Sequence, residues 1–230
     1  MPYRMLDDYT ETQTVAAVGA NLTFSVPFAR ADSFALLNLQ GMKVAITITE
    51  SGGDVIFQET VYMQEDISGL SLYAYYFEPI VDGDTYINTN VPLGFNATMS
   101  VTIYPAGETD YAKLGHIIIG RQVEIGATKY GTELALTDYS KKIVDDFGYA
   151  TLIRRSYSKN ATMSLFVQPS RVNYVTSLLA DLRATPILVE GSNTDIGYEA
   201  LTIFGWLEDW RTVYQGPNEN ELSIEVQGLV

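Results

Sequence analysis

The residues of this chain best suited to chemistry lie between positions 71 and 86, in the stretch SLYAYYFEPIVDGDTY. Aromatic rings stand beside carboxylates there. A ring that stacks on a sugar, next to an acid that accepts hydrogen bonds from its hydroxyls, is a plausible carbohydrate site. The same composition also suits a core strand of a β-sandwich followed by an acidic loop. The residues concerned are Tyr73, Tyr75, Tyr76, Phe77, Glu78, Asp82, Asp84 and Tyr86.

Strand alternation divides this stretch between two faces, because successive side chains of a strand point in opposite directions. Tyr73, Tyr75 and Phe77 share a face that carries no charge, so this face is the better candidate for the core. Tyr76 then points outward together with Glu78. The candidate sugar or interaction site shrinks to a smaller set, and a core strand with an exposed acidic loop remains the alternative. That set is Tyr76, Tyr86, Asp82 and Asp84.

Cysteine and histidine, two side chains that serve as catalytic nucleophiles, bases or metal ligands, are scarce. The chain has no cysteine and one histidine, His116. This histidine lies in the apolar run LGHIIIG, where a partly buried strand residue is expected rather than a triad member or zinc ligand. The sequence also lacks the phosphate-binding loop, the dinucleotide fingerprint, the zinc-protease motif and the nucleophile elbow. We therefore expect no enzymatic activity and no cofactor.

Carboxylates are numerous but are not arranged as an acid–base pair. Asp145 adjoins Asp146 and Glu208 adjoins Asp209, and neighbours on a strand point to opposite faces. The sequence DGDT at 82–85 resembles part of a calcium loop, but it supplies two aspartates where calcium takes roughly six to eight oxygens. These acids are expected to be solvated loop charges, and no metal site is predicted.

Charge narrows the class of partner. The formal net charge is −14, from 14 basic and 28 acidic side chains. This balance argues against binding a phosphate backbone, which requires clustered cations. The basic cluster RRSYSK at 154–159 is expected to alternate as a strand, with Arg154 on one face and Arg155 on the other. It favours an interaction edge or a salt-bridged surface, and it could meet an acidic patch on another copy of the chain. No apolar run is as long as the roughly eighteen residues of a membrane span, so neither nucleic-acid binding nor membrane insertion is expected.

The first half predicts a β-sandwich or jelly roll. Residues 1–16 show no clear apolar period and are expected to form an extended arm that becomes ordered only on a neighbouring subunit. Short alternating runs separated by turn residues follow, as in sandwiches and jelly rolls. Pro105 and Gly107 favour a domain boundary, which places the sandwich at 17–112. The predicted strands are 22–28, 33–39, 43–49, 54–63, 85–91 and 97–104.

The second half, 113–230, predicts an α+β domain of antiparallel strands with one amphipathic helix. The helix is expected at about 170–183, where Val172, Val175 and Leu179 recur at helical spacing, and Pro186 prevents its continuation. The fold class is therefore mainly β, with a sandwich domain followed by an α+β domain.

The second half also resembles tail proteins of double-stranded DNA bacteriophages, namely baseplate or tail-tip components of long-tailed phages and prophages. The resemblance extends over most of the chain, since such proteins carry a β-sandwich with an aromatic-rich strand before the Gly-Arg junction. Its motifs are structural rather than catalytic. They are Gly120 and Arg121, Gly126, Tyr130 and Gly131, Asp138 to Ser140, Phe147 and Gly148, Arg154 and Arg155, and Arg183 to Pro186.

This resemblance implies a structural protein of the virion tail that is made in the cytoplasm of the host bacterium. Its partners would be copies of itself and other tail or baseplate proteins. Arg121, Arg154 and Arg155 are the candidate assembly residues. Sandwich domains of such tails often resemble carbohydrate-binding folds, so a module that contacts bacterial surface polysaccharide remains the alternative function.

Overall fold

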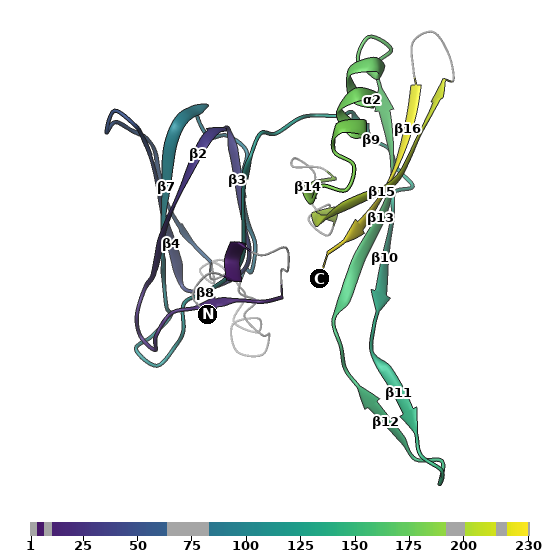
Figure 1. The fold of residues 1–230 in the computed structure, drawn as a ribbon, viewed down its shortest axis with the longest axis horizontal. Helices are drawn as coiled ribbons and strands as arrows, with labels where there is room; N and C mark the ends of the chain where they lie inside the picture. The colour runs from purple at the N-terminus through teal and green to yellow at the C-terminus, as the bar shows by residue number, and fades with distance from the viewer. Residues whose placement is uncertain (1–3, 7–10, 64–82, 192–200, 215–219, 230) are drawn as a thin grey trace, which may run out of the picture. The chain divides into compact units, whose positions relative to one another are not determined.

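A computed structural model describes residues 4–6, 11–63, 83–191, 201–214 and 220–229. Over these residues the chain is mainly β with one α-helix, as the sequence predicts, and the sheets are antiparallel (Figure 1). It divides into two compact units, Met1–Gln122 and Val123–Val230. Each unit has its own hydrophobic core.

The described residues of the first unit form two four-stranded sheets. One has the order β1-β8-β3-β6 and the other the order β2-β7-β4-β5. This is the jelly-roll arrangement, in which a long hairpin is rolled up so that paired strands alternate between two facing sheets. The predicted sandwich is thereby confirmed. The strands are β1 Thr14–Val15, β2 Leu22–Ala31, β3 Ser33–Gln40, β4 Lys43–Glu50, β5 Val55–Tyr62, β6 Tyr86–Asn88, β7 Gly94–Tyr104 and β8 Lys113–Gly120.

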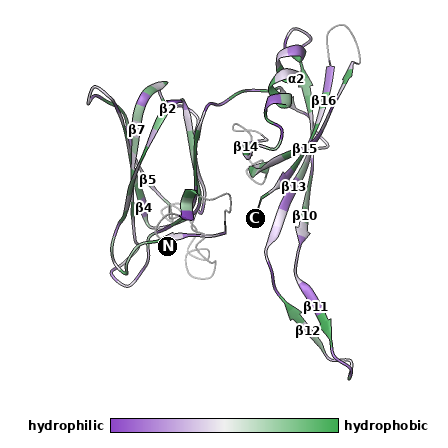
Figure 2. Cartoon of the chain, viewed as in Figure 1, coloured by the Kyte–Doolittle hydropathy of each residue, from purple (hydrophilic) through white to green (hydrophobic). Residues whose placement is uncertain are grey.

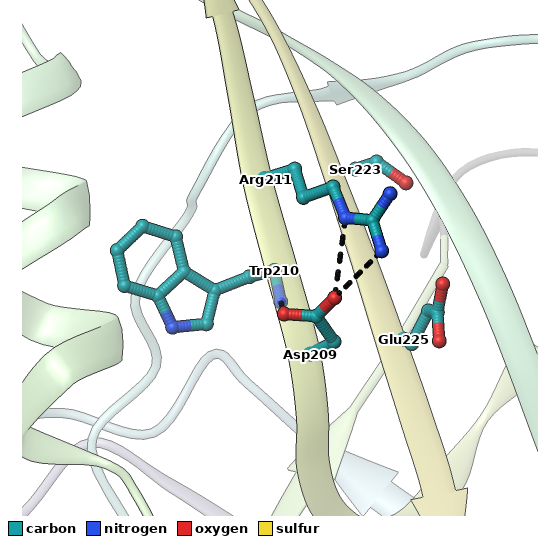
Figure 3. A pocket seen from close by; sticks show the side chains of 5 residues that line it. All are labelled: Asp209, Trp210, Arg211, Ser223 and Glu225. Atoms are coloured by element: carbon teal, nitrogen blue, oxygen red, sulfur yellow. Dashed lines mark hydrogen bonds and ion pairs between the residues drawn. The ribbon is translucent and has the colours of Figure 1, made fainter.

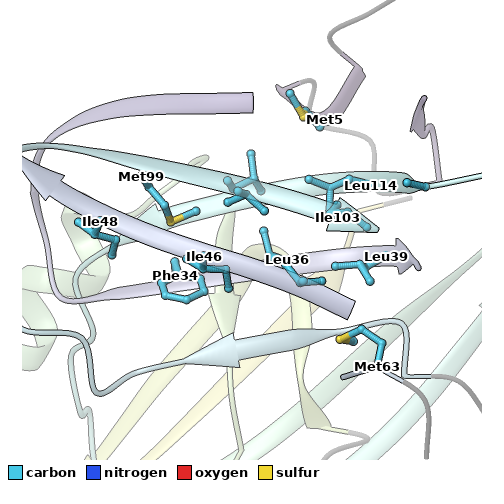
Figure 4. Packing of buried hydrophobic residues seen from close by; sticks show 14 of the residues in the cluster. Met5, Phe34, Leu36, Leu39, Ile46, Ile48, Met63, Met99, Ile103 and Leu114 are labelled. Atoms are coloured by element: carbon cyan, nitrogen blue, oxygen red, sulfur yellow. The ribbon is translucent and has the colours of Figure 1, made fainter. Parts of the chain in front are cut away.

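Alternating hydrophobicity creates this core. In β4, Val44, Ile46 and Ile48 are buried, while the residues between them lie on the outer face. Every second residue of β7 is buried in the same way, starting at Ala97. The side chains from the two sheets meet between them (Figure 4), as expected for two sheets that each bury one face.

The eighth strand lies in the first unit, although the sequence assigned it to the second domain. Strand β8 pairs along most of its length with β3 and also pairs with β1. Without it, the sheet would lose the strand that joins β1 to β3. The turn around Pro105 and Gly107 therefore connects two strands of one jelly roll, and the compact units divide ten residues later, after Gln122.

The N-terminal segment also differs from the expected arm. Met5, in the short 3₁₀ helix η1 (Arg4–Leu6), is 4% exposed and belongs to the first core. Its backbone N–H donates to the hydroxyl of Thr14 at 3.0 Å, and β1 pairs with β8. Burial of Met5 in its own unit gives this segment a place to pack without a neighbouring subunit.

The second unit is one antiparallel sheet of order β10-β13-β16-β15-β14, with β9 pairing beside β10 on β13, and a separate two-stranded ribbon, β11-β12. In Figure 1 the ribbon continues the direction of β10 and β13 away from the rest of the sheet. The strands are β9 Ala127–Thr128, β10 Glu133–Asp138, β11 Lys141–Val144, β12 Ala150–Ile153, β13 Tyr157–Val167, β14 Ile187–Val189, β15 Ile203–Tyr214 and β16 Asn220–Gly228.

Helix α2 (Val172–Asp181) is the predicted amphipathic helix. Val172, Val175 and Leu179 are buried and pack in the second core with the inner face of the sheet. The helix has its C-cap at Leu182, and Ala184 has a positive φ of 55°, so the chain turns away before Pro186. A bulge between Leu207 and Asp209 changes the register of β15, so that Leu207 and Trp210 both reach the core.

Candidate interaction surfaces

The predicted sugar site lies only partly within the described residues. Tyr76 and Asp82, together with the rest of the stretch 64–82, lie outside them. Asp84 is exposed; its carboxylate accepts a hydrogen bond from the Thr85 hydroxyl at 3.0 Å, and its carbonyl accepts one from the Leu39 N–H. Tyr86 lies in β6 and is half-buried.

Tyr86 belongs to a polar bridge between the two sheets of the jelly roll. Its hydroxyl donates to the Glu59 carboxylate at 2.7 Å, and the Asn88 amide donates to the same carboxylate oxygen at 2.9 Å. Its ring lies 5.9 Å from the Phe34 ring, centroid to centroid. Glu59 comes from β5 and Tyr86 from β6, which are edge strands of different sheets. The arrangement therefore closes one side of the sandwich.

Burial raises the pKa of Tyr86 to about 12, and the neighbouring Glu59 carboxylate acts in the same direction. The neutral phenol is thus the form that the folded chain favours. The stability that this pKa shift contributes to the folded chain is fully present below pH 10.0, the ordinary tyrosine pKa. It is lost as the pH rises from there towards 12. We expect Tyr86→Phe to remove about 1–2 kcal/mol of this pH-dependent stability, after allowance for solvent screening. Urea unfolding at neutral and alkaline pH measures it.

Tyr62→Phe is the matched control, because Tyr62 is 66% exposed on the neighbouring strand β5. The control variant should follow the wild-type dependence on pH. If Tyr86→Phe also loses stability between pH 10 and 12 as steeply as the wild type, Tyr86 is not the titrating group.

The adjacent carboxylates Glu208 and Asp209 both lie in β15. Asp209 accepts from the Arg211 guanidinium at 3.1 Å on the outer face of the second sheet, whereas the neighbouring Glu208 lies at the bulge of β15. Figure 3 shows the ion pair beside Ser223 and Glu225. These residues and Trp210 line a hollow of about 50 Å³. That volume is far below the roughly 300 Å³ of a small ligand pocket.

His116 is 8% exposed in β8, so it is a buried strand residue. Within the part of the chain that the structure describes, three or more potential metal ligands do not cluster anywhere. Among the same residues, no helix is long and apolar enough to cross a membrane.

The candidate assembly arginines fall in different units. Arg121 is exposed one residue after β8, near the end of the first unit. Arg154 and Arg155 are exposed between β12 and β13, in the second. The expected strand alternation through 154–159 is wrong at its start, because β13 begins only at Tyr157.

Arg154 and Arg155 belong to the most unusual surface of the molecule, a long two-stranded projection. We call residues 133–157 the hairpin arm. Strand β10 pairs with the first half of β13, and β11 pairs with β12 beyond them. Every side chain from Glu133 to Arg155 is exposed. Figures 1 and 2 show the arm leaving the sheet of its own unit as a narrow ribbon, with apolar segments on β11 and β12.

The hairpin arm is rich in large apolar side chains. Ten of them are at least 40% exposed, and Phe147 at the tip reaches 87%. Since cross-strand partners share a face, Ile143 and Ile153 lie on one face of the ribbon, whereas Val144 and Leu152 lie on the other. Both faces therefore carry exposed apolar side chains. The ten are Leu134, Leu136, Tyr139, Ile143, Val144, Phe147, Tyr149, Leu152, Ile153 and Tyr157.

Local hydrogen bonds fix the tip of the arm. One Asp145 carboxylate oxygen accepts from the backbone N–H groups of Phe147 and Tyr149, at 3.0 and 2.7 Å. The N–H of Asp145 donates to the Tyr149 carbonyl at 3.0 Å, and Gly148 supplies the positive φ of 85° that the turn needs. This turn holds two exposed aromatic rings at defined positions.

Hydrogen bonds also define the middle of the arm, where β10 passes into β11. The Arg155 N–H donates to the Ser140 hydroxyl at 3.0 Å, and the Tyr139 N–H donates to the Ser156 carbonyl. Asp138 accepts from the Ser140 N–H at 2.8 Å. The pKa of Asp138 is lowered by its hydrogen bonds with Ser140, with a smaller contribution from Arg154. Lys141, Lys142, Arg154 and Arg155 stand at this level and form what we call the basic collar.

Comparison with known proteins gives no family. No protein-family model matches the chain, and no curated protein matches it.

Proposed function

We propose that this protein is a structural subunit of a bacteriophage tail or baseplate that assembles by protein–protein contacts through its hairpin arm. The observation that carries the proposal is the set of ten exposed apolar side chains on both faces of the arm. A two-stranded hairpin is marginally stable in water by itself, and exposed apolar surface of this extent is typical of an interaction site.

Three features support an assembly role over a catalytic one. The arm is structured at its tip and middle, which lowers the entropy lost on docking. Tyrosine and phenylalanine, which supply much of its apolar surface, are enriched at protein interfaces. The resemblance to tail proteins supplies the setting, in which the second unit anchors the subunit in the virion and the jelly roll is carried as a separate domain.

Location in the particle tests this function. Particles released from bacteria that carry the gene should contain the chain when analysed by quantitative mass spectrometry, and immunogold labelling should place it on the tail. A chain that accumulates in the bacterial cytoplasm but is missing from purified particles would overturn the proposal. A capsid protein of the same particles serves as the control for recovery.

A further inference from the structure

The hairpin arm differs in charge from the rest of the chain. Residues 133–157 hold four basic and four acidic side chains, so the remaining residues carry the whole net charge of −14. Within the arm, the cations gather at one level. Lys141 and Lys142 stand opposite Ile153 and Leu152, next to Arg154 and Arg155. None of these four cations is in an ion pair within the described part of the chain.

The first unit offers a surface with the complementary pattern. Val15 and Val18 are 49% and 52% exposed, and Tyr111 is 43% exposed. Glu108 and Asp110 are exposed acids beside them. We call these five residues the N-terminal edge patch. Lys113 also lies there, with its ammonium 5.8 Å from the centre of the Tyr111 ring.

Backbone contacts show that the two segments that carry the patch are adjacent. Val15 is the cross-strand partner of Lys113 in β8. The Ala16 N–H donates to the Ala112 carbonyl at 3.0 Å, and the Gly19 N–H donates to the Asp110 carbonyl at 2.9 Å. Gly19 is so close to the Glu108 carbonyl that a Cβ would lie 2.6 Å from its oxygen. Segment 15–19 therefore runs alongside 108–113.

Two acids of the second unit's sheet are in ion pairs, whereas the acids of this patch are in none among the described residues. Glu221 is paired with Lys129 at 3.1 Å, and Asp209 is paired with Arg211 at 3.1 Å. Neither of these two ion pairs includes Glu108 or Asp110. An apolar surface bordered by carboxylates outside these ion pairs fits an apolar ribbon whose cations are also outside them, with Asp138 as the acid beside Arg154.

We propose that the hairpin arm of one copy of this chain docks on the N-terminal edge patch of a second copy. Cations on one face of the basic collar would contact Glu108 and Asp110, and apolar side chains of the arm would cover Val15, Val18 and Tyr111. The proposal rests on the assembly role of the arm. Because arm and patch are different surfaces, the contact is head-to-tail and repeats from copy to copy, giving a ring or an open filament.

Charge reversal tests the pairing in the full-length chain by sedimentation velocity over a range of concentrations. The wild type should self-associate, and more weakly at high salt than at low salt. Arg154→Glu with Arg155→Glu, and separately Glu108→Arg with Asp110→Arg, should each weaken association by about 10-fold or more. An equimolar mixture of the two variants should associate again, because each arm then meets a patch of opposite charge.

Matched controls reverse charges elsewhere. Arg183 and Asp54 are exposed and lie off both surfaces, so Arg183→Glu and Asp54→Arg should associate as the wild type does. Circular dichroism melts of all variants establish that each is folded.

Three results would overturn the self-docking proposal: a wild-type chain that stays monomeric at every concentration, charge-reversed variants that associate normally, or a mixture that fails to regain association. None of these results decides whether the arm serves assembly. A monomeric chain whose apolar arm variants still fail to enter particles would have a different tail protein as its partner.

Discussion

Replacement of Phe34 by alanine is expected to lower the free energy of unfolding of the jelly roll by about 3–5 kcal/mol. Phe34 is 3% exposed in β3. Its ring contacts Phe57 of β5 at 6.0 Å and Tyr86 of β6 at 5.9 Å, between centroids, so it joins both sheets at the side closed by the Glu59 bridge. Truncation would leave a cavity next to a hydrogen-bonded carboxylate, which adds to the lost burial.

Urea unfolding followed by circular dichroism measures the effect, and Phe95→Ala is the control. Phe95 is 52% exposed in β7, where it stacks under Arg30 with the guanidinium carbon 5.3 Å from its ring centre. Its loss should cost no more than about 1 kcal/mol. Equal shifts for the two variants would mean that Phe34 does not hold the sheets together.

The jelly roll was predictable from the sequence because alternation is a local signal. Lys43 to Thr49 alternates strictly, and the structure buries Val44, Ile46 and Ile48. The pairing order of the strands is a different matter. Nothing within β8 states that it lies between β1 and β3, since that placement follows from contacts made with residues far away in sequence. The domain boundary predicted after residue 112 therefore falls in the connection between β7 and β8, which belong to the two facing sheets of one jelly roll.

The helix could be predicted from the sequence, whereas the exposure of the arm could not. Val172, Val175 and Leu179 share a face whether or not a sheet is present, so the helix could be predicted. In the arm, the apolar residues have strand-like types, and sequence alone cannot distinguish an apolar strand that is covered from one that is exposed. Leu152 and Ile153 lie on opposite faces of the ribbon, which is the one local sign that neither face is a simple core face.

The basic cluster at 154–159 indicated an interaction surface on what proves to be the arm. The predicted strand alternation was wrong for its first three residues, because β13 begins at Tyr157. Arg154 and Arg155 lie in the break between β12 and β13. There the Arg155 N–H donates a hydrogen bond to the hydroxyl of Ser140, in the opposite segment of the arm. For Tyr86, nearness to acids in the sequence suggested a sugar or interaction site. The structure adds what the sequence could not show: the ring packs on Phe34, and the hydroxyl is hydrogen-bonded to Glu59, a partner 27 positions away.

The second large effect is expected at the tip of the hairpin arm. Phe147→Ser, Tyr149→Ser and Leu152→Ser in one chain should remove the chain from purified particles while leaving its unfolding midpoint nearly unchanged. These side chains are 87%, 75% and 77% exposed, so they contribute little to the folded monomer. In an interface, three such anchors at about 1–2 kcal/mol each would reduce affinity by roughly 100-fold or more.

The matched control carries the same kind of change off the arm. Val55, Tyr62 and Tyr214 are 56%, 66% and 72% exposed, and their triple replacement by serine alters a similar apolar area. Complementing a gene deletion with each variant, and quantifying the chain in particles by mass spectrometry, separates a specific site from general surface hydrophobicity. Equal loss of both variants, or normal incorporation of the tip variant, would show that the arm is not the assembly surface. Loss of the tip variant alone would place the assembly contact on Phe147, Tyr149 and Leu152, because the turn held by Asp145 involves only backbone groups of the replaced residues and would survive the substitutions.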